Sequence, residues 1–251
     1  MENKKIIYYE QLDSTNTKAH ELAVEGAEHG TVVVASRQTA GKGRRGRVWE
    51  SSANENIYMS ILLRPNLAIE KAPMLTLVMA NSMARVLQEK GFFDIQIKWP
   101  NDLVLSEKKV CGILTEMYLK GDSIDHVIVG VGVNVNTKSF PTDLVDKATS
   151  LFMECGKHLN KDDLIVEIVD AFMIEYERFL RKGDLGFLQE EYNSRLINRA
   201  REVCVLEPKK EYKAHAIGIN QMGELVVRLS DGTEKNVFAG EVSVRGVYGY
   251  V

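Results

Sequence analysis

The stretch Val127-Ile128-Val129-Gly130-Val131-Gly132-Val133-Asn134-Val135 decides the fold class. Its apolar residues run on without polar alternation, which is typical of a strand buried on both faces. Residues 73–91 repeat their apolar side chains at helical spacing and end at Gly91, and residues 164–180 form a second amphipathic pattern. A buried strand combined with amphipathic helices predicts an α+β domain.

Shorter elements surround these three. Asp13-Ser14-Thr15-Asn16 predicts a helix cap before residues 17–23, and Gly26 follows as a stop signal. A second short helix is expected over 185–192. A polar hairpin loop is expected at Ser106-Glu107-Lys108-Lys109. Strand-like segments occupy residues 31–36, 57–64, 95–99, 103–105 and 110–117.

The sequence pattern changes near residue 199. Short strands separated by turn signals follow one another over 203–205, 212–219, 225–229, 235–238 and 242–244. Closely spaced short strands are typical of a small barrel. We therefore predict two domains, an α+β main domain over 1–198 and a β-barrel over 199–251.

Composition excludes several classes of protein. The 251 residues carry 32 Lys+Arg against 35 Asp+Glu, a net charge of -3, with 45% hydrophobic and 27% charged residues, which excludes a disordered chain. No apolar run approaches the roughly 20 residues of a membrane span, and no signal-peptide core is present. Three scattered cysteines indicate neither a disulfide framework nor a zinc site. A cytoplasmic protein with no structural metal and no general affinity for nucleic acid is expected.

The most unusual segment is Gly41-Lys42-Gly43-Arg44-Arg45-Gly46-Arg47-Val48-Trp49, which we call the glycine–arginine loop. Glycines let a backbone wrap closely around a ligand, and clustered guanidiniums suit phosphate or carboxylate oxygens. A solvated basic loop is the alternative. The position of the loop after the predicted strand 31–36, and its end at one of only two tryptophans, favour a binding lid.

Other candidate groups are weaker when taken singly. Lys98-Trp99-Pro100-Asn101-Asp102 is either a plain turn or a cluster of amide, carboxylate and amine, in which Asp102 could hold a divalent metal with triphosphate. The glycines of 130–134 could serve only close strand packing. Lys109, at a hairpin end, reads in isolation as an exposed turn lysine.

Taken together, these segments resemble the biotin protein ligases over essentially the whole chain. The motifs that carry the resemblance occur in order: Asp13 to Asn16, Gln38 with Gly41 to Trp49, Lys98 to Leu103, Lys109 to Leu114 with Glu116, Gly130 to Asn134, Ala148 to Leu151 and Gly240 to Arg245. One departure is Lys42, where the family usually has arginine. Charge is kept but the bidentate fork is lost.

The resemblance implies a class II synthetase-like catalytic domain with a mixed or antiparallel sheet, followed by an SH3-like barrel. It also implies roles for single residues. Ser14, Thr15, Asn16 and Gln38 would hold the ureido ring of biotin, and Lys42, Gly43, Arg44 and Trp49 would close over the biotin tail. Lys109 would contact the biotin carboxylate and the α-phosphate, with Lys109 and Arg44 catalytic. Residues expected near ATP are Arg45, Arg47, Asn101, Asp102, Asn134 and, from the barrel, Arg245.

The reaction implied by the resemblance has two steps. Biotin and ATP with Mg²⁺, to which Asp102 is a candidate ligand, give biotinyl-5′-adenylate. A lysine of a biotin carboxyl carrier protein domain then takes the biotinyl group. Cations would offset the repulsion between two anions in the first step, and a lid would keep water from the intermediate. The resemblance leaves both a monomer and a homodimer open.

Three alternatives differ in class. A lipoate or octanoate ligase shares the fold, but Ser14 to Asn16 and Gln38 would have no use with a plain fatty chain. A DNA-binding, biotin-responsive repressor would need a helix-turn-helix before residue 13, where this sequence has no room for one, so the short ligase form without that module is expected. A binding module without catalysis need not retain Arg44, Asp102 and Lys109.

Overall fold

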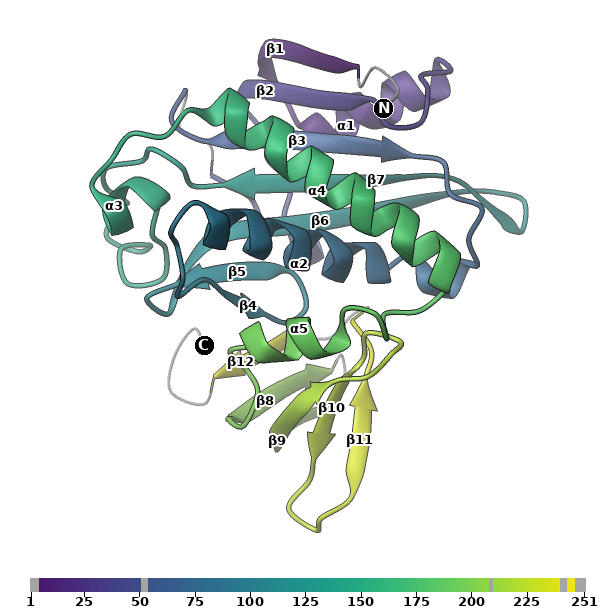
Figure 1. Ribbon diagram of the computed structural model, residues 1–251, viewed down its shortest axis with the longest axis vertical. Coiled ribbons are helices and arrows are strands. Elements are labelled where there is room, and N and C mark those ends of the chain that lie inside the picture. Colours follow the sequence, from purple (N-terminus) through teal and green to yellow (C-terminus); the bar gives the residue numbers. More distant parts are fainter. Residues whose placement is uncertain (1–4, 51–53, 208–209, 240–242, 247–251) are drawn as a thin grey trace. The chain divides into compact units, whose positions relative to one another are not determined.

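Two sheets organise the protein, and the computed structural model describes residues 5–50, 54–207, 210–239 and 243–246 of it (Figure 1). A seven-stranded sheet has the order β1-β2-β3-β7-β6-β5-β4, and a five-stranded sheet has the order β11-β10-β9-β8-β12. In the larger sheet β1 runs parallel to β2, while β2, β3, β7 and β6 are successively antiparallel. The predicted α+β class with a mixed sheet is confirmed.

The chain divides into two units, Met1–Thr76 with Val110–Val166, and Leu77–Lys109 with Glu167–Val251. Elements of the first unit are β1 (Ile6–Leu12), α1 (Thr15–Val24), β2 (Val32–Gln38), η1 (Arg44–Gly46), β3 (Ile57–Leu63), η2 (Ile69–Lys71), β7 (Ser123–Val133) and α3 (Leu151–Cys155). Elements of the second are β4 (Gln96–Lys98), β5 (Asp102–Leu105), α5 (Gln189–Arg195), β8 (Glu202–Glu207), β9 (Lys210–Ile219), β10 (Leu225–Arg228), β11 (Glu234–Val237) and β12 (Ser243–Gly246). Three elements contribute residues to both units: α2 (Met74–Glu89), β6 (Lys108–Lys120) and α4 (Lys161–Lys182).

The sequence-based assignment of these elements is correct for most of the chain. It missed β1 and α3, and it made the hairpin loop too long. The turn between β5 and β6 consists of Ser106 and Glu107, both with positive φ as in a two-residue hairpin, and Lys108 already belongs to β6. Val242, expected in the last strand, lies outside the described residues.

The C-terminal strands form an antiparallel sheet that begins at Glu202. Among the residues described, β11 and β12 are its two edges, so closure into a barrel remains a prediction. The domain boundary at residue 199 also remains a prediction. In the same described part of the chain, none of the helices combines the length and the apolar character that a membrane crossing requires.

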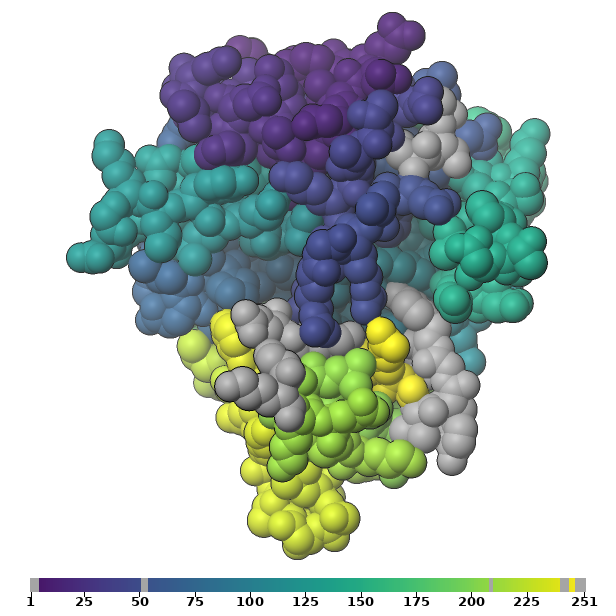
Figure 2. Space-filling model, turned by 180° about the vertical axis from the view of Figure 1, so that it is seen from behind, coloured from purple at the N-terminus to yellow at the C-terminus, as the bar shows by residue number. Residues whose placement is uncertain are grey.

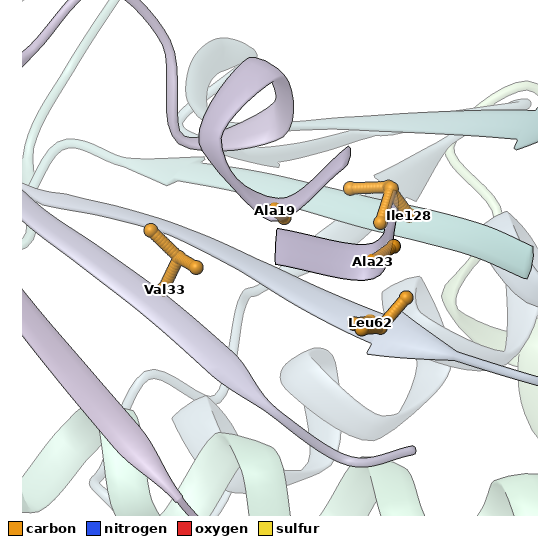
Figure 3. Packing of buried hydrophobic residues seen from close by; sticks show 5 residues of the cluster. All are labelled: Ala19, Ala23, Val33, Leu62 and Ile128. Atoms are coloured by element: carbon orange, nitrogen blue, oxygen red, sulfur yellow. The ribbon is translucent and has the colours of Figure 1, made fainter. Parts of the chain in front are cut away.

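Helix α1 packs on one face of the first unit's sheet, across β2, β3 and β7. Its small residues Ala19 and Ala23 are buried against Val33, Leu62 and Ile128, one side chain from each strand (Figure 3). Leu62 and Ile128 are register partners, so the helix rests on neighbouring side chains of a single face. Figure 2 views the molecule from this side, with the N-terminal elements in purple. Close packing here fixes where the helix begins relative to the strands.

A second contact holds the same helix further along its length. His20 stacks on Tyr118 with ring centroids 3.9 Å apart, and its Nδ1 lies 2.9 Å from Nε2 of the buried His126 on β7. Helix α1 therefore has little freedom to slide along the sheet.

In the second unit, a network of ion pairs ties α2, α4 and α5 together. Arg85 on α2 pairs with Glu175 at 2.8 Å and with Glu191 at 2.9 Å, and Arg195 pairs with Glu191 at 2.7 Å. Burial by itself raises the pKa of Glu191, but hydrogen bonds from Arg85, Asn81 and Arg195 outweigh it and lower the pKa from 4.5 to about 2. Glu191 therefore stabilises the fold as a carboxylate.

This lowered pKa predicts a pH-dependent effect of Glu191→Gln. The carboxylate's contribution is complete above its ordinary pKa of 4.5 and is lost as the pH falls toward about 2. At pH 7 the variant should lose about 1–2 kcal/mol of unfolding free energy, a modest figure because a third of the side chain is exposed. Urea unfolding between pH 7 and pH 3 should show this difference shrinking. The exposed neighbour Glu190→Gln is the control, and equal behaviour of the two variants would contradict the assignment.

Candidate active site

The first turn of α1 lies directly on β7 at a position where the strand has no side chain. A Cβ added to Gly130 would come within 2.0 Å of Asn16 Oδ1, so only glycine allows this approach. Gly130 is the register partner of Ser60 on β3 and of Leu114 on β6. The side chain of Asn16 is therefore held against the middle of the sheet, where it is only 4% exposed.

Polar side chains around Asn16 form one hydrogen-bonded chain. Ser60 Oγ lies 2.6 Å from Asn16 Oδ1 and 2.8 Å from Thr15 Oγ1. Gln38, at the end of β2, accepts through Oε1 from the Thr15 backbone N–H at 2.8 Å, and the Thr15 hydroxyl lies 3.1 Å from the same oxygen. Ser14 is the buried N-cap residue just before them. We call Thr15, Asn16, Gln38 and Ser60 the polar network.

The glycine–arginine loop forms a small hairpin beside the polar network. Lys42 and Val48 form an isolated antiparallel β-bridge. The Gly43 N–H donates to Arg47 O at 2.7 Å, and the Trp49 N–H donates to Gly41 O at 2.9 Å. An added Cβ on Gly41 would lie 2.4 Å from Trp49 O and 3.0 Å from Gln38 Nε2. The loop therefore starts in close contact with the polar network.

The end of the loop returns to the sheet. A Cβ on Gly132 would lie 2.6 Å from the indole ring of Trp49, so the tryptophan covers a second bare position of β7. Gly132 faces Gly112 of β6 in register. Gly112, Gly130 and Gly132 are a glycine strip, a stretch of sheet surface without side chains that is bordered by Asn16 and Trp49.

The cations of the loop differ in their surroundings. Lys42, Arg45 and Arg47 are exposed, whereas Arg44 is half-buried in η1. Lys42 Nζ lies 3.8 Å from Glu116 Oε1 on β6. Asn134, another predicted site residue, follows β7 and is buried, and its amide donates to Thr149 O at 3.1 Å. Its described contacts thus fix the backbone after the glycine strip.

The remaining predicted site residues belong to the second unit. Lys109 Nζ forms an ion pair with Asp102 Oδ1 at 2.7 Å, across the hairpin of β5 and β6. Asn101 lies immediately before β5, and Arg245 is exposed on β12, opposite Cys204. An ion pair of lysine and aspartate presents both a cation for phosphate and a carboxylate for a metal. A role for Arg245 at the site remains a prediction.

Trp99 explains why the turn before Asp102 has its shape. Its indole is buried and donates through Nε1 to Gly223 O at 3.0 Å, and its backbone N–H donates to Asn198 Oδ1 at 2.9 Å. The tryptophan is thus a structural anchor that fixes the start of the segment carrying Asn101 and Asp102.

The sequence assigned no role to two residues of this arrangement, Ser60 and the motif residue Glu116. Ser60 is the one polar side chain in the fully buried strand Ile57–Leu63, a signal that the sequence does contain. Glu116 Oε2 accepts from Asn16 Nδ2 at 2.6 Å, although the two residues are 100 positions apart. No local pattern could have paired them.

The contact of Gly130 with Asn16 predicts a specific double-mutant result. Gly130→Ala should reduce the free energy of unfolding by about 1–3 kcal/mol, because a methyl group is forced into a filled space. In an Asn16→Ala background, which removes the colliding amide, most of that loss should disappear. Urea unfolding of the four proteins in the cycle measures the coupling. Equal losses in both backgrounds would mean that the two residues do not touch.

Comparison with known proteins agrees with this geometry. Residues 8–134 match the biotin/lipoate A/B protein ligase family. The bifunctional ligase/repressor BirA of Bacillus subtilis is 35% identical over 95% of this chain and 74% of its own length. The biotin–[acetyl-CoA-carboxylase] ligase of Paracoccus denitrificans is 40% identical over 49% of this chain and 51% of its own. The structure of the Aquifex aeolicus biotin protein ligase in complex with biotin and ATP is 30% identical and matches with a TM-score of 0.86 over 97% of this chain and 99% of that one. The chain belongs to the biotin/lipoate A/B protein ligase family, and within it to the biotin protein ligases.

Proposed function

We propose that this protein activates biotin with ATP and transfers the biotinyl group to a lysine of a biotin carboxyl carrier domain. The observation that carries the proposal is the polar network beside the glycine strip, in which motif residues of α1 and β2 are joined with Ser60 of β3. The Aquifex aeolicus ligase, which matches this chain over 97% of its length, was solved with biotin and ATP. The relative from Paracoccus denitrificans is named as a ligase that joins biotin to acetyl-CoA carboxylase.

Recognition of biotin requires groups that both donate and accept hydrogen bonds. The ureido ring is neutral, with two N–H donors and one carbonyl acceptor. Both functions are offered by the buried hydroxyls of Ser14 and Thr15, the buried amide of Asn16 and the half-buried amide of Gln38. The glycine strip lets Asn16 and Trp49 lie directly on the sheet backbone at Gly130 and Gly132, and in this proposal the two side chains flank the bicyclic ring.

In the first step, a biotin carboxylate oxygen attacks the α-phosphorus of ATP. A new P–O bond forms, and the bond from phosphorus to the bridging oxygen of pyrophosphate breaks. Both reactants are anions, so Lys109 and Arg44 serve as the cations that offset their repulsion. Without ligand Lys109 is paired with Asp102, and in this scheme it shares its charge with the incoming phosphate and carboxylate.

In the second step, the ε-amine of the carrier lysine attacks the acyl carbonyl of biotinyl-5′-adenylate. The C–O bond to phosphate breaks, AMP leaves, and the amine loses a proton as the amide forms. Water competes with the amine for the same carbonyl. The role of the glycine–arginine loop is to exclude water while the adenylate waits for the carrier.

Mg²⁺ is proposed as the companion of ATP rather than as a resident ion. Among the described residues, no three His, Cys, Asp or Glu side chains gather in a way that could hold a metal. A magnesium ion that arrives on the triphosphate needs one or two carboxylates, and Asp102 is the candidate. The ion would neutralise phosphate charge during displacement. Competition from Lys109 for Asp102 is part of this proposal.

The other expectations stay predictions. They are a cytoplasmic location and the absence of DNA binding. The choice between monomer and homodimer stays open.

The function is tested by biotin-dependent exchange of labelled pyrophosphate into ATP, followed by transfer of labelled biotin to a carrier domain. Exchange with biotin and not with lipoate or octanoate is the expected result. Pyrophosphate exchange with lipoate but not with biotin would refute this proposal and indicate a lipoate ligase of the same family.

Replacement of Lys109 separates catalysis from folding. Lys109→Ala should lower the exchange rate by at least about a hundredfold, a typical loss when one electrostatic group is removed from a reacting centre. Its unfolding free energy should change by less than about 1 kcal/mol, because the side chain is not in the core. Lys108→Ala is the matched control, since adjacent strand residues point to opposite faces. Exchange at the wild-type rate in Lys109→Ala would refute the role given to this lysine.

The loop should become ordered when the intermediate forms. Residues 41–47 of the loop include three glycines, and holding them in one conformation costs on the order of 1–2 kcal/mol per residue in backbone entropy. The exposed side chains of Lys42, Arg45 and Arg47 offset little of this cost. Trypsin should therefore cut after Arg44, Arg45 or Arg47 early, and biotin plus ATP should slow these cuts several-fold. Mass mapping of the first fragments gives the rates. Unchanged cleavage would mean that the loop is not a lid.

A further inference from the structure

We propose that Glu116 is a positioning residue for biotin recognition and that it links the glycine–arginine loop to the polar network. The proposal rests on the function proposed above. One carboxylate oxygen accepts from Asn16 Nδ2 at 2.6 Å, and the other lies 3.8 Å from Lys42 Nζ. The two partners come from the start of α1 and from the loop, which are the elements expected around the ligand.

The contact with Asn16 determines which way round that amide lies. A carboxylate can only accept hydrogen bonds, so Glu116 requires the NH₂ group of Asn16 on its side. Leu114 O, 3.4 Å from the same nitrogen, favours the same orientation. Asn16 Oδ1 must then face Ser60 Oγ, 2.6 Å away.

This orientation fixes the protons of the neighbouring hydroxyls. Ser60 has a single proton and must give it to Asn16 Oδ1, which can only accept. Ser60 then has no proton left for Thr15, whose own single hydroxyl proton is shared between Ser60 Oγ at 2.8 Å and Gln38 Oε1 at 3.1 Å. Gln38 is oriented separately, by the Thr15 N–H that it accepts. Glu116 thus sets the donors and acceptors of Asn16 and Ser60 although it lies at the edge of the polar network.

The contact with Lys42 is of a different kind. Both side chains are substantially exposed and the separation is long, so this ion pair alone contributes little to stability. What it supplies is a link between the closing loop and the recognition network. Lysine offers a single point charge here, whereas an arginine at 42 would present a fork of N–H donors to the same carboxylate.

The two functions of Glu116 are separable by substitution. Glu116→Ala removes both contacts and should raise the Kd for biotin, measured by calorimetry without ATP, about tenfold, with a similar rise in the KM for biotin. The maximal rate should change by less than about threefold, because Glu116 touches no reacting atom. Glu116→Gln keeps one acceptor for Asn16, so its Kd should rise by less than about threefold.

The link to the loop has its own measurement, the release of biotinyl-5′-adenylate into solution when no carrier is present. Lys42→Met and Glu116→Gln should each accelerate release, and the double variant should be no faster than the faster single one. Lys42→Arg should slow release. Glu21→Ala, which removes an exposed carboxylate from α1, is the matched control. It should change neither the Kd for biotin nor the rate of adenylate release.

The outcomes distinguish this inference from the proposed function. Failure of the wild-type protein to bind biotin or to exchange pyrophosphate would defeat the proposed function. If the wild-type protein is active and the Kd of Glu116→Ala for biotin lies within twofold of the wild-type Kd, the positioning role is overturned. If Glu116→Ala has a much lower melting temperature than the wild type, Ser60→Ala is measured in its place. Ser60→Ala removes the other hydrogen-bond partner of the Asn16 amide. Additive effects of Lys42→Met and Glu116→Gln on release would overturn the link.

Discussion

A side-chain amide packed against a backbone without a Cβ is the constraint on which the first unit of this protein depends. Asn16 can enter the hydrogen-bonded chain with Ser60, Thr15 and Gln38 only because Gly130 leaves the middle of β7 bare. Ala19 and Ala23 bring the rest of α1 equally close to the strands. Small residues on both surfaces therefore bring the polar network onto the middle of the sheet, and a larger side chain at this contact would separate the helix from the strands.

The two kinds of chemistry in the reaction use two kinds of contact. In the proposed function, recognition of a neutral ring relies on the largely buried hydrogen bonds of the polar network in the first unit. The charged side chains proposed for the reaction instead form ion pairs that can exchange partners, Lys109 with Asp102 and Lys42 with Glu116. Buried hydrogen bonds suit selectivity, because an unsatisfied buried group is costly, whereas exchangeable ion pairs suit a reaction in which phosphate charge arrives and leaves.

Much of the fold could be predicted from the sequence because apolar patterning is local. The apolar run over 127–135 and the helical spacing over 73–91 can each be recognised within a few residues of sequence. Strand β1 does not, since Ile6–Leu12 is an edge strand with neither continuous burial nor regular alternation. Helix α3, at five residues, is too short to show a period.

The site was predicted to a similar extent. The glycines of β7 could be noticed but not interpreted, because their meaning lies in Asn16 and Trp49, which reach them from distant segments. Glu116 was part of a motif, but its contact with Asn16 depends on the tertiary fold alone. Motif residues thus mark the region of the site, and only the three-dimensional contacts say what each one does there.

The order of the strands also has a consequence for the way the chain is made. β1, α1, β2 and β3 leave the ribosome first, yet β3 pairs with β7, which begins only at Ser123. Until Ile128 is synthesised, the apolar face of Ala19 and Ala23 lacks one of its three covering side chains, and Asn16 lacks Glu116. Contacts between residues so far apart in sequence form slowly, because the chain loses the entropy of closing the loop before the contacts stabilise it. From Leu63 to Ser123, an interval of 60 residues of synthesis, β3 therefore remains an unpaired sheet edge, and this segment is where a chaperone would be expected to act during translation.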